Sequence, residues 1–415
     1  MTTSGRRARS VAALASSATL AAFRVAGYPA LWLSGAASGF SRSVTQVAIG
    51  WITLTATDSI LAVGATFAAR MVPALLLGIP LGGLVDRYDR RATLILVNLA
   101  AIVPLLWAAA VAANGTLAVT QLILLSLALG VVDTLSGTAT QTYSFDLVGP
   151  AGATNAIALG NLGVFLAGGV GSIAGGLALQ RLGVASPFIL SAVMAAVAAV
   201  CLVAGGTRAR RERPPPHVVP SFSRSMTLIA RNRRVALIAL VVVMTEILGF
   251  SSITVYPTFA RDVLDSDAAG LGALATARQI GAIAGLLLLA RWGLGKSRGG
   301  RLILLATFGL GVGLTAFAAS TSFALSFAVL VLVGAAMAGV DTLGQTLVQR
   351  NVDDAERGSA MGIWFFAIGF GPLGLVGLGA AASAFGAPVA LAISGALLAS
   401  FAVGLSRVRA IHELV

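Results

Sequence analysis

The sequence predicts an all-α membrane protein with twelve transmembrane helices in two pseudo-symmetric six-helix halves. Three observations lead to this fold class: the composition, the number of long apolar runs and an internal repeat. Hydrophobic residues make up 57% of the 415 residues and charged residues only 10%, and the mean hydropathy is +0.93. A water-soluble globule of this composition would expose much of its apolar surface. Soluble classes are therefore excluded.

The apolar runs set the number of helices. A membrane-spanning helix needs about 20 apolar residues, and such runs lie near 28–55, 61–84, 93–113, 117–140, 155–179, 184–206, 235–260, 268–292, 301–319, 323–347, 359–384 and 388–406. Between the sixth and seventh runs the chain is rich in arginine and contains three consecutive prolines, which is typical of a solvated linker. The predicted parts are a tail at 1–26, a first half at 27–206, a linker at 207–234, a second half at 235–406 and a tail at 407–415.

The basic residues predict the orientation. Most of the 28 lysines and arginines lie in the two tails, the linker and every second loop, and basic residues concentrate on the cytoplasmic side of membrane proteins. Both termini are therefore predicted to be cytoplasmic, with anionic lipid headgroups against the linker arginines. The use of arginine almost to the exclusion of lysine indicates a bacterial source, so the expected location is a bacterial inner membrane. Because the charge is spread over membrane-side loops, nucleic-acid binding is not expected.

An internal repeat supports the division into halves. The segment Val132-Asp133-Thr134-Leu135 recurs 208 residues later as Val340-Asp341-Thr342-Leu343, and the same offset relates Gly64 to Gly272 and Arg70 to Arg278. Opposite charges duplicated at one offset predict an ion pair of Arg70 with Asp133 and a second pair of Arg278 with Asp341. A role of these residues in a proton relay is the alternative.

Charged residues inside membrane helices are costly and indicate a functional cavity or a partner. The sequence contains six of them: Arg42, Arg70, Asp133, Glu246, Arg278 and Asp341. Glu246 is predicted to be the protonatable group, because apolar surroundings disfavour a charged carboxylate. Arg42 is predicted to attract an anionic group of a substrate or to pair with Glu246, and a purely structural salt bridge between these two is the alternative. Gln46 lies on the same helical face as Arg42.

Enzymatic chemistry is not expected. The chain has a single cysteine, Cys201, and two histidines, His217 and His412, in polar segments, so no catalytic or metal-binding group can be assembled from them. No cofactor is predicted, and a proton gradient is the expected driving force.

Residues 78–91 read GIPLGGLVDRYDRR, a charged turn between two apolar runs. This stretch resembles the signature loop of the major facilitator superfamily, with Asp89 where that family usually has glycine. Further segments resemble its drug:proton antiporter branch of enterobactin exporters and macrolide-efflux pumps: 70–73, 257–264 and 357–362. Two departures from that branch are a missing arginine at 138–142 and a missing proline at 171–176, although Gly371-Pro372 is present.

The resemblance implies a conformational latch on the cytoplasmic side. Gly82 would allow close helix approach, and Asp86 would meet the start of the helix near Ser359. Arg87, Arg90 and Arg91 would bind inner-face carboxylates and lipid phosphates. A charge cluster that only sets the topology is the alternative.

The expected function is proton-coupled efflux of a small amphipathic compound, such as a drug, siderophore or metabolite, by alternating access. An importer or uniporter of a small anionic metabolite is the alternative, and a non-transporting membrane receptor is a remote one. The expected partners are a small-molecule substrate, protons and membrane lipids, and the chain is expected to act as a monomer.

Overall fold

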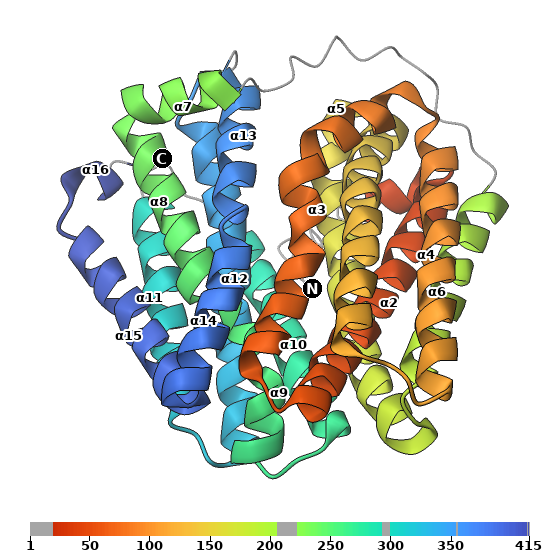
Figure 1. The fold of residues 1–415 in the computed structure, drawn as a ribbon. Helices are drawn as coiled ribbons and strands as arrows, with labels where there is room; N and C mark the ends of the chain where they lie inside the picture. The colour runs from red at the N-terminus through yellow and green to blue at the C-terminus, as the bar shows by residue number, and fades with distance from the viewer. Residues whose placement is uncertain (1–19, 206–221, 293–298, 354–355, 413, 415) are drawn as a thin grey trace, which may run out of the picture.

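The computed structural model describes residues 20–205, 222–292, 299–353, 356–412 and 414, which are helical with short connections. Figure 1 shows two helical bundles side by side, one from each half of the chain. The last helix of the first bundle ends, and the first helix of the second bundle begins, at the same end of the molecule. We call this end the linker face and the other end the opposite face. The predicted all-α architecture in two helical halves is confirmed.

The first half begins with a 3-10 turn, η1 (Ala21–Arg24), inside the predicted tail. Its membrane helices are α2 (Tyr28–Thr57), α3 (Ile60–Arg87), α4 (Arg90–Ala113), α5 (Val119–Leu182) and α6 (Ser186–Ala204). The long α5 contains two membrane spans, which bend into one another at Gly149, where φ is +72°. Glycine adopts this conformation at little cost.

The second half begins with α7 (Phe222–Arg231) and α8 (Arg233–Leu248), and α8 continues through η2 (Phe250–Thr254), α9 (Tyr256–Thr258) and the π-helical η3 (Phe259–Val263). The next helices are α10 (Ala268–Trp292), α11 (Gly299–Ala318) and α12 (Phe323–Arg350). One further span is formed by α13 (Arg357–Ile368) together with α14 (Gly371–Phe385), and α15 (Ala387–Leu405) and the short α16 (Arg409–His412) complete the chain.

Within the described residues, eleven segments are long and apolar enough to cross a membrane. The thirty-residue α2 is not among them, because Arg42, Gln46 and several hydroxyl side chains lower its hydropathy. It nevertheless runs between the two faces beside the other helices of its half (Figure 1). The arrangement thus matches the predicted series of twelve.

Two predicted boundaries need correction. Residues 207–234 were expected to be a solvated linker, but α7 lies across the linker face and α8 begins at Arg233. The turn expected at 86–91 is shorter, because α3 continues to Arg87 and α4 begins at Arg90. The Asp89 side chain accepts a hydrogen bond from the Ala92 amide over 2.7 Å, and this N-cap allows α4 to begin directly after the turn.

The two halves converge at the opposite face and diverge at the linker face (Figure 1). At the opposite face, the close contacts between helices of the two halves depend on glycine. A Cβ atom on Gly64 of α3 would lie 2.4 Å from the carbonyl oxygen of Leu375, and one on Gly176 of α5 would lie 2.3 Å from that of Ala268. Larger side chains would force the halves apart. Glycine therefore permits the tight seal on this side of the molecule.

Candidate functional site

Three charged side chains of the first half form one cluster between α2, α3 and α5. Nε of Arg70 donates to Oδ2 of Asp133 over 2.7 Å, and Nη2 of Arg42 lies 3.1 Å from Oδ1 of the same carboxylate. Nη1 of Arg70 also donates to the Thr45 hydroxyl over 3.1 Å. The predicted pair of Arg70 with Asp133 is therefore present, and Arg42 joins it.

This first-half cluster contains two arginines and one carboxylate, so it carries an excess positive charge. Its members differ in exposure, since 49% of the Arg42 side chain is accessible but only 16% of the Arg70 side chain. The expected alternative of a salt bridge between Arg42 and Glu246 is wrong, because the guanidinium of Arg42 is directed to Asp133 on a neighbouring helix of its own half. The sequence offered no signal for this partner, since Arg42 lies outside the repeat.

The predicted pair of Arg278 with Asp341 is not formed within the described chain. The reason is that the helices of the second half cross at a different position along the chain. In the first half, a Cβ on Gly130 of α5 would lie 2.3 Å from the Arg70 carbonyl oxygen. In the second half, the glycine that approaches Arg278 in this way is Gly334 of α12, whose Cβ would lie 2.0 Å from the Arg278 carbonyl oxygen.

The two crossings therefore differ by one helical turn. Asp133 lies three residues beyond Gly130, but Asp341 lies seven residues beyond Gly334. At about 1.5 Å per residue this moves the second carboxylate some 6 Å farther from its arginine along the helix axis. The sequence repeat is thus preserved without its ion pair in the second half.

Glu246 lies in the second half, and its environment differs from that of the first-half cluster. Only 6% of the residue is exposed, and within the described chain it has neither an ion-pair nor a hydrogen-bond partner. The charged group that acts on it electrostatically is the Asp341 carboxylate on α12. Glu246 therefore has another acid, and no arginine, as its charged neighbour within the described chain.

Helix breaks surround Glu246. It lies two residues before the end of α8, where Gly249 leads into η2. A Cβ on Gly371, the first residue of α14, would lie 3.2 Å from Oε2 of Glu246 and 2.7 Å from Cε of Met71 on α3. Glu246 thus lies where two interrupted helices of the second half meet α3 of the first half. Interruptions of this kind allow a membrane helix to bend.

A small cavity of about 30 Å³ lies between the halves nearer the opposite face. Its lining includes Gln46 and Ser43 from α2 together with Arg278 and Gln279 from α10. The space holds about one water molecule, so it is too small for an organic substrate. The structure brings the predicted residues Gln46 and Arg278 together at this cavity, across the boundary between the two halves.

Polar contacts close the opposite face. Asp58, in the left-handed conformation after α2, forms an ion pair with Arg261 of η3, and Gln180 of α5 donates to Asp267. The amide of Leu61 donates to Oγ of Ser383 over 3.2 Å. Sequence reasoning missed this group because each residue lies in an ordinary loop or helix end, and only the fold brings the two halves together.

At the linker face, three predicted latch residues, Gly82, Asp86 and Arg87, belong to α3, but only their backbone lies within the described part of the structure. Arg90 pairs with Asp146 at the end of the first span of α5. Nε and Nη2 of Arg91 donate to the Leu202 and Val203 carbonyls over 2.9 and 3.0 Å. Arginines in these positions stabilise a helix C-terminus, so these two residues tie α4 to its own half.

Ser359, the predicted partner of the latch, lies in the first turn of α13 and lines a pocket with residues of α7.

Within the described residues no group of three or more His, Cys, Asp or Glu side chains could hold a metal ion. The membrane-embedded site therefore consists of the first-half cluster, the Glu246–Asp341 pair of acids and the contacts that close the opposite face.

Comparison with known proteins identifies the family to which this chain is similar. A sequence model of the family described as transmembrane secretion effector matches residues 17–413. No curated protein matches the chain significantly.

Solved transporter structures share the fold. A mutant of the nucleoside transporter NupG is 14% identical with a TM-score of 0.71, covering 92% of this chain and 99% of its own. An auto-inhibited peptide transporter of the POT family is 13% identical with a TM-score of 0.71, covering 92% and 96%. A bacterial homologue of the human lysosomal transporter Spinster is 15% identical with a TM-score of 0.69, covering 93% and 95%. At this level of identity the likeness concerns the fold alone.

Proposed function

This chain belongs to the transmembrane secretion effector family of the major facilitator superfamily, whose members are secondary transporters rather than enzymes, and from that premise we propose that it exports a small amphipathic compound in exchange for protons. Alternating access between its two halves would carry the substrate across the membrane.

Glu246 is the observation that carries this proposal. A charged carboxylate that is buried and lacks a counter-charge is unfavourable in a membrane, and this one lies beside a second acid, Asp341. Taking up a proton removes that cost. Because the Glu246 carboxyl and the methyl group of Met71 on α3 both lie beside Gly371 at the start of α14, the charge of Glu246 would act close to the contact between the two halves.

The described state has its opposite face closed. The arginine-rich segments lie at the linker face, so the bias of basic residues supports a cytoplasmic linker face and an inward-facing state in a bacterial inner membrane. Closure of this face would bring Asp86 and Gly82 toward Ser359, as the signature loop implies. The protein would work as a monomer, because each chain contains both halves.

The substrate path would pass the half-exposed Arg42. Its guanidinium and the neighbouring Gln46 are available for an acidic or hydrogen-bonding group of the substrate, while Asp133 compensates part of the charge. This excess positive charge also favours the second candidate function, import or uniport of a small anionic metabolite. The two candidates differ in whether a proton moves against the substrate.

Transport in proteoliposomes tests the proposal. The purified protein is reconstituted with an acidic lumen, and accumulation of ethidium and of fluorescein, a cationic and an anionic amphipathic dye, is followed together with lumenal pH. We expect one dye to accumulate while protons leave. Glu246→Gln should abolish accumulation but retain exchange of dye across the membrane. Asp353→Asn, an exposed acid beyond α12, serves as the matched control.

The outcomes separate the candidates. Accumulation that is independent of the pH gradient, with wild type and Glu246→Gln behaving alike, would rule out coupling through Glu246. Uptake of fluorescein down its own gradient without proton movement would favour the uniporter.

A further inference from the structure

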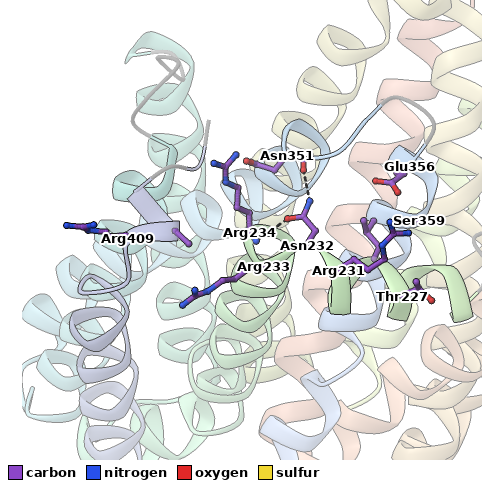
Figure 2. Close-up of a pocket in the computed structure, with 11 residues that line it drawn as sticks. Thr227, Arg231, Asn232, Arg233, Arg234, Asn351, Glu356, Ser359 and Arg409 are labelled. Atoms are coloured by element: carbon purple, nitrogen blue, oxygen red, sulfur yellow. Dashed lines mark hydrogen bonds between the residues drawn. The ribbon is translucent and has the colours of Figure 1, made fainter.

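The linker face of the second half contains a second, much larger cavity, of about 970 Å³. It lies where α7 ends, α8 and α13 begin and α16 packs nearby (Figure 2). Its lining contains four arginines and one acid: Arg231, Arg233, Arg234, Arg409 and Glu356. A cavity of this size accommodates a small ligand, and its charge favours an anion.

Three of these arginines are available to a ligand. Arg231, Arg233 and Arg409 are exposed, and within the described chain they form no ion pair or side-chain hydrogen bond. Each guanidinium offers five N–H donors in a planar fork that suits phosphate oxygens. Figure 2 shows Arg233 extending toward the α16 side of the cavity and Arg231 lying beside Ser359 of α13. Arg231 and Arg233 therefore lie on two sides of the start of α8, and Arg409 extends from α16 at the outer edge of the cavity (Figure 2).

Two helices begin at the cavity wall and add to its positive potential. The N-cap of α8 is Asn232, whose Oδ1 accepts from the amides of Arg234 and Val235. The N-cap of α13 is Glu356, which makes no such capping hydrogen bond. Helix N-termini carry a partial positive charge and bind phosphate groups. Two of them acting with arginine side chains make a stronger anion site than either feature alone.

The wall of the cavity is held in place by the same asparagine. Nδ2 of Asn232 donates to the Asn351 carbonyl over 3.0 Å, which fixes the corner between α7 and α8 against the end of α12. On α7, Leu228 is 7% exposed and packs into the core of the second half. The arginines are therefore mounted on a packed scaffold.

The position of α7 indicates the source of the anion. This helix lies across the end of the bundle and does not run along the membrane-crossing helices (Figure 1), and it has an apolar side directed inward and Arg231 at its end. Amphipathic helices in this orientation lie at the level of lipid headgroups, where anionic lipids attract arginine. A phosphate at this depth is more often part of a lipid than free in solution.

We propose that this pocket and its rim bind the phosphate groups of anionic phospholipids, with Arg231, Arg233 and Arg409 as the residues that contact them. The site shares no residue with the first-half cluster or with Glu246, although Ser359 in its lining is also the predicted partner of the latch. Its occupancy would fix α7 and the starts of α8 and α13 against the membrane.

Lipid binding to the full-length protein in detergent tests the site. The midpoint of thermal unfolding is titrated with phosphatidylglycerol, with phosphatidylcholine and with inorganic phosphate, because a ligand that binds the folded state raises it. The pocket variant combines Arg231→Gln, Arg233→Gln and Arg409→Gln. The control variant removes the same charge from exposed arginines at the linker face outside the pocket: Arg24→Gln, Arg291→Gln and Arg301→Gln.

We expect phosphatidylglycerol to bind at least tenfold more tightly than phosphatidylcholine, and the pocket variant to lose that preference while the control variant keeps it within twofold. Glu356→Gln, which removes the acid of the lining, should bind phosphatidylglycerol more tightly. This variant tests the site even if the triple variant fails to fold.

Two results would change the conclusion. If inorganic phosphate stabilises wild type as well as phosphatidylglycerol does at the same concentration, and only the pocket variant loses the effect, the phosphate site stands but its ligand is soluble. The proposal is wrong if the pocket and control variants lose phosphatidylglycerol binding equally, or if Glu356→Gln does not change that binding. The arginines would then act only as diffuse charge.

Discussion

Nε of Arg70 lies 2.7 Å from Oδ2 of Asp133, whereas the repeat copies of these residues, Arg278 and Asp341, form no pair in the described chain. The same two residue types at the same sequence offset thus serve different purposes in the two halves. In the first half the carboxylate compensates arginines, and in the second it lies near another acid, Glu246.

The first prediction concerns this difference. Asp133→Asn leaves Arg42 and Arg70 without their common counter-charge, and removal of one partner of a buried ion pair costs on the order of 3 kcal/mol. Asp341→Asn removes a carboxylate that compensates nothing, so it should be neutral or stabilising. Thermal unfolding in detergent should therefore show a midpoint several degrees lower for Asp133→Asn only. Equal destabilisation by both variants would contradict the asymmetry.

The second prediction tests the crossings that produce the asymmetry. Alanine at Gly130 or Gly334 would place Cβ 2.3 or 2.0 Å from a backbone carbonyl oxygen of the crossing helix. The helices must then separate, and overpacking of this kind costs about 1–3 kcal/mol. Gly137 on α5 and Gly309 on α11 have open space at the Cβ position.

These two positions provide matched controls, because alanine has a higher helix propensity than glycine by about 0.5–1 kcal/mol. We expect Gly137→Ala and Gly309→Ala to leave the unfolding midpoint unchanged or raise it, while Gly130→Ala and Gly334→Ala lower it. A loss at all four positions would show that flexibility, not close approach, explains these glycines.

The fold was largely predictable from the sequence. Twelve apolar runs and a repeat at an offset of 208 define the helices and the halves, because membrane-spanning segments must satisfy their backbone hydrogen bonds internally and can hardly be anything but helices. Arg70 and Asp133 were also predictable as a pair, since both the charge and the repeat marked them.

The remainder of the site depends on how helices cross, which no local pattern records. The partnership of Arg42 with Asp133 requires α2 and α5 to meet at that level. The separation of Arg278 from Asp341 follows from a glycine displaced by one turn. The pairing of Asp58 with Arg261 joins residues 203 positions apart through the contact of two bundles. Each is a tertiary result, and a periodicity argument does not reach it.

The third prediction tests whether the closed opposite face opens during transport. Leu61 of α3 and Ser383 of α14 are joined by a hydrogen bond of 3.2 Å, so cysteines at both positions are close enough for a disulfide. The background carries Cys201→Ser, which removes the natural cysteine. Oxidation should stop dye transport nearly completely, and a reductant should restore it.

The single-cysteine variants Leu61→Cys and Ser383→Cys control for oxidation itself and should transport equally well in both conditions. Transport at the wild-type rate by the cross-linked protein would mean that α3 and α14 stay together throughout the cycle, which contradicts alternating access at this face.

The fourth prediction concerns the space beside Glu246. A Cβ on Gly371 would lie 2.7 Å from Cε of Met71 and 3.2 Å from Oε2 of Glu246. Gly371→Ala must therefore push the flexible methionine aside, and it should lower transport several-fold while the unfolding midpoint changes little. Met71→Ala combined with Gly371→Ala frees the space again and should restore most of the rate.

The double variant distinguishes two explanations of Gly371. If the glycine were needed only for bending between α13 and α14, shortening Met71 on another helix would not compensate for the added methyl group, and both variants would transport equally slowly. Rescue by Met71→Ala instead requires that the two halves press on each other beside the Glu246 carboxyl. The double-mutant cycle also gives a coupling energy between Met71 and Gly371, which belong to separate halves. If this coupling is present in the wild-type background and absent in the Glu246→Gln background, the charge of Glu246 controls the contact that must break when the opposite face opens.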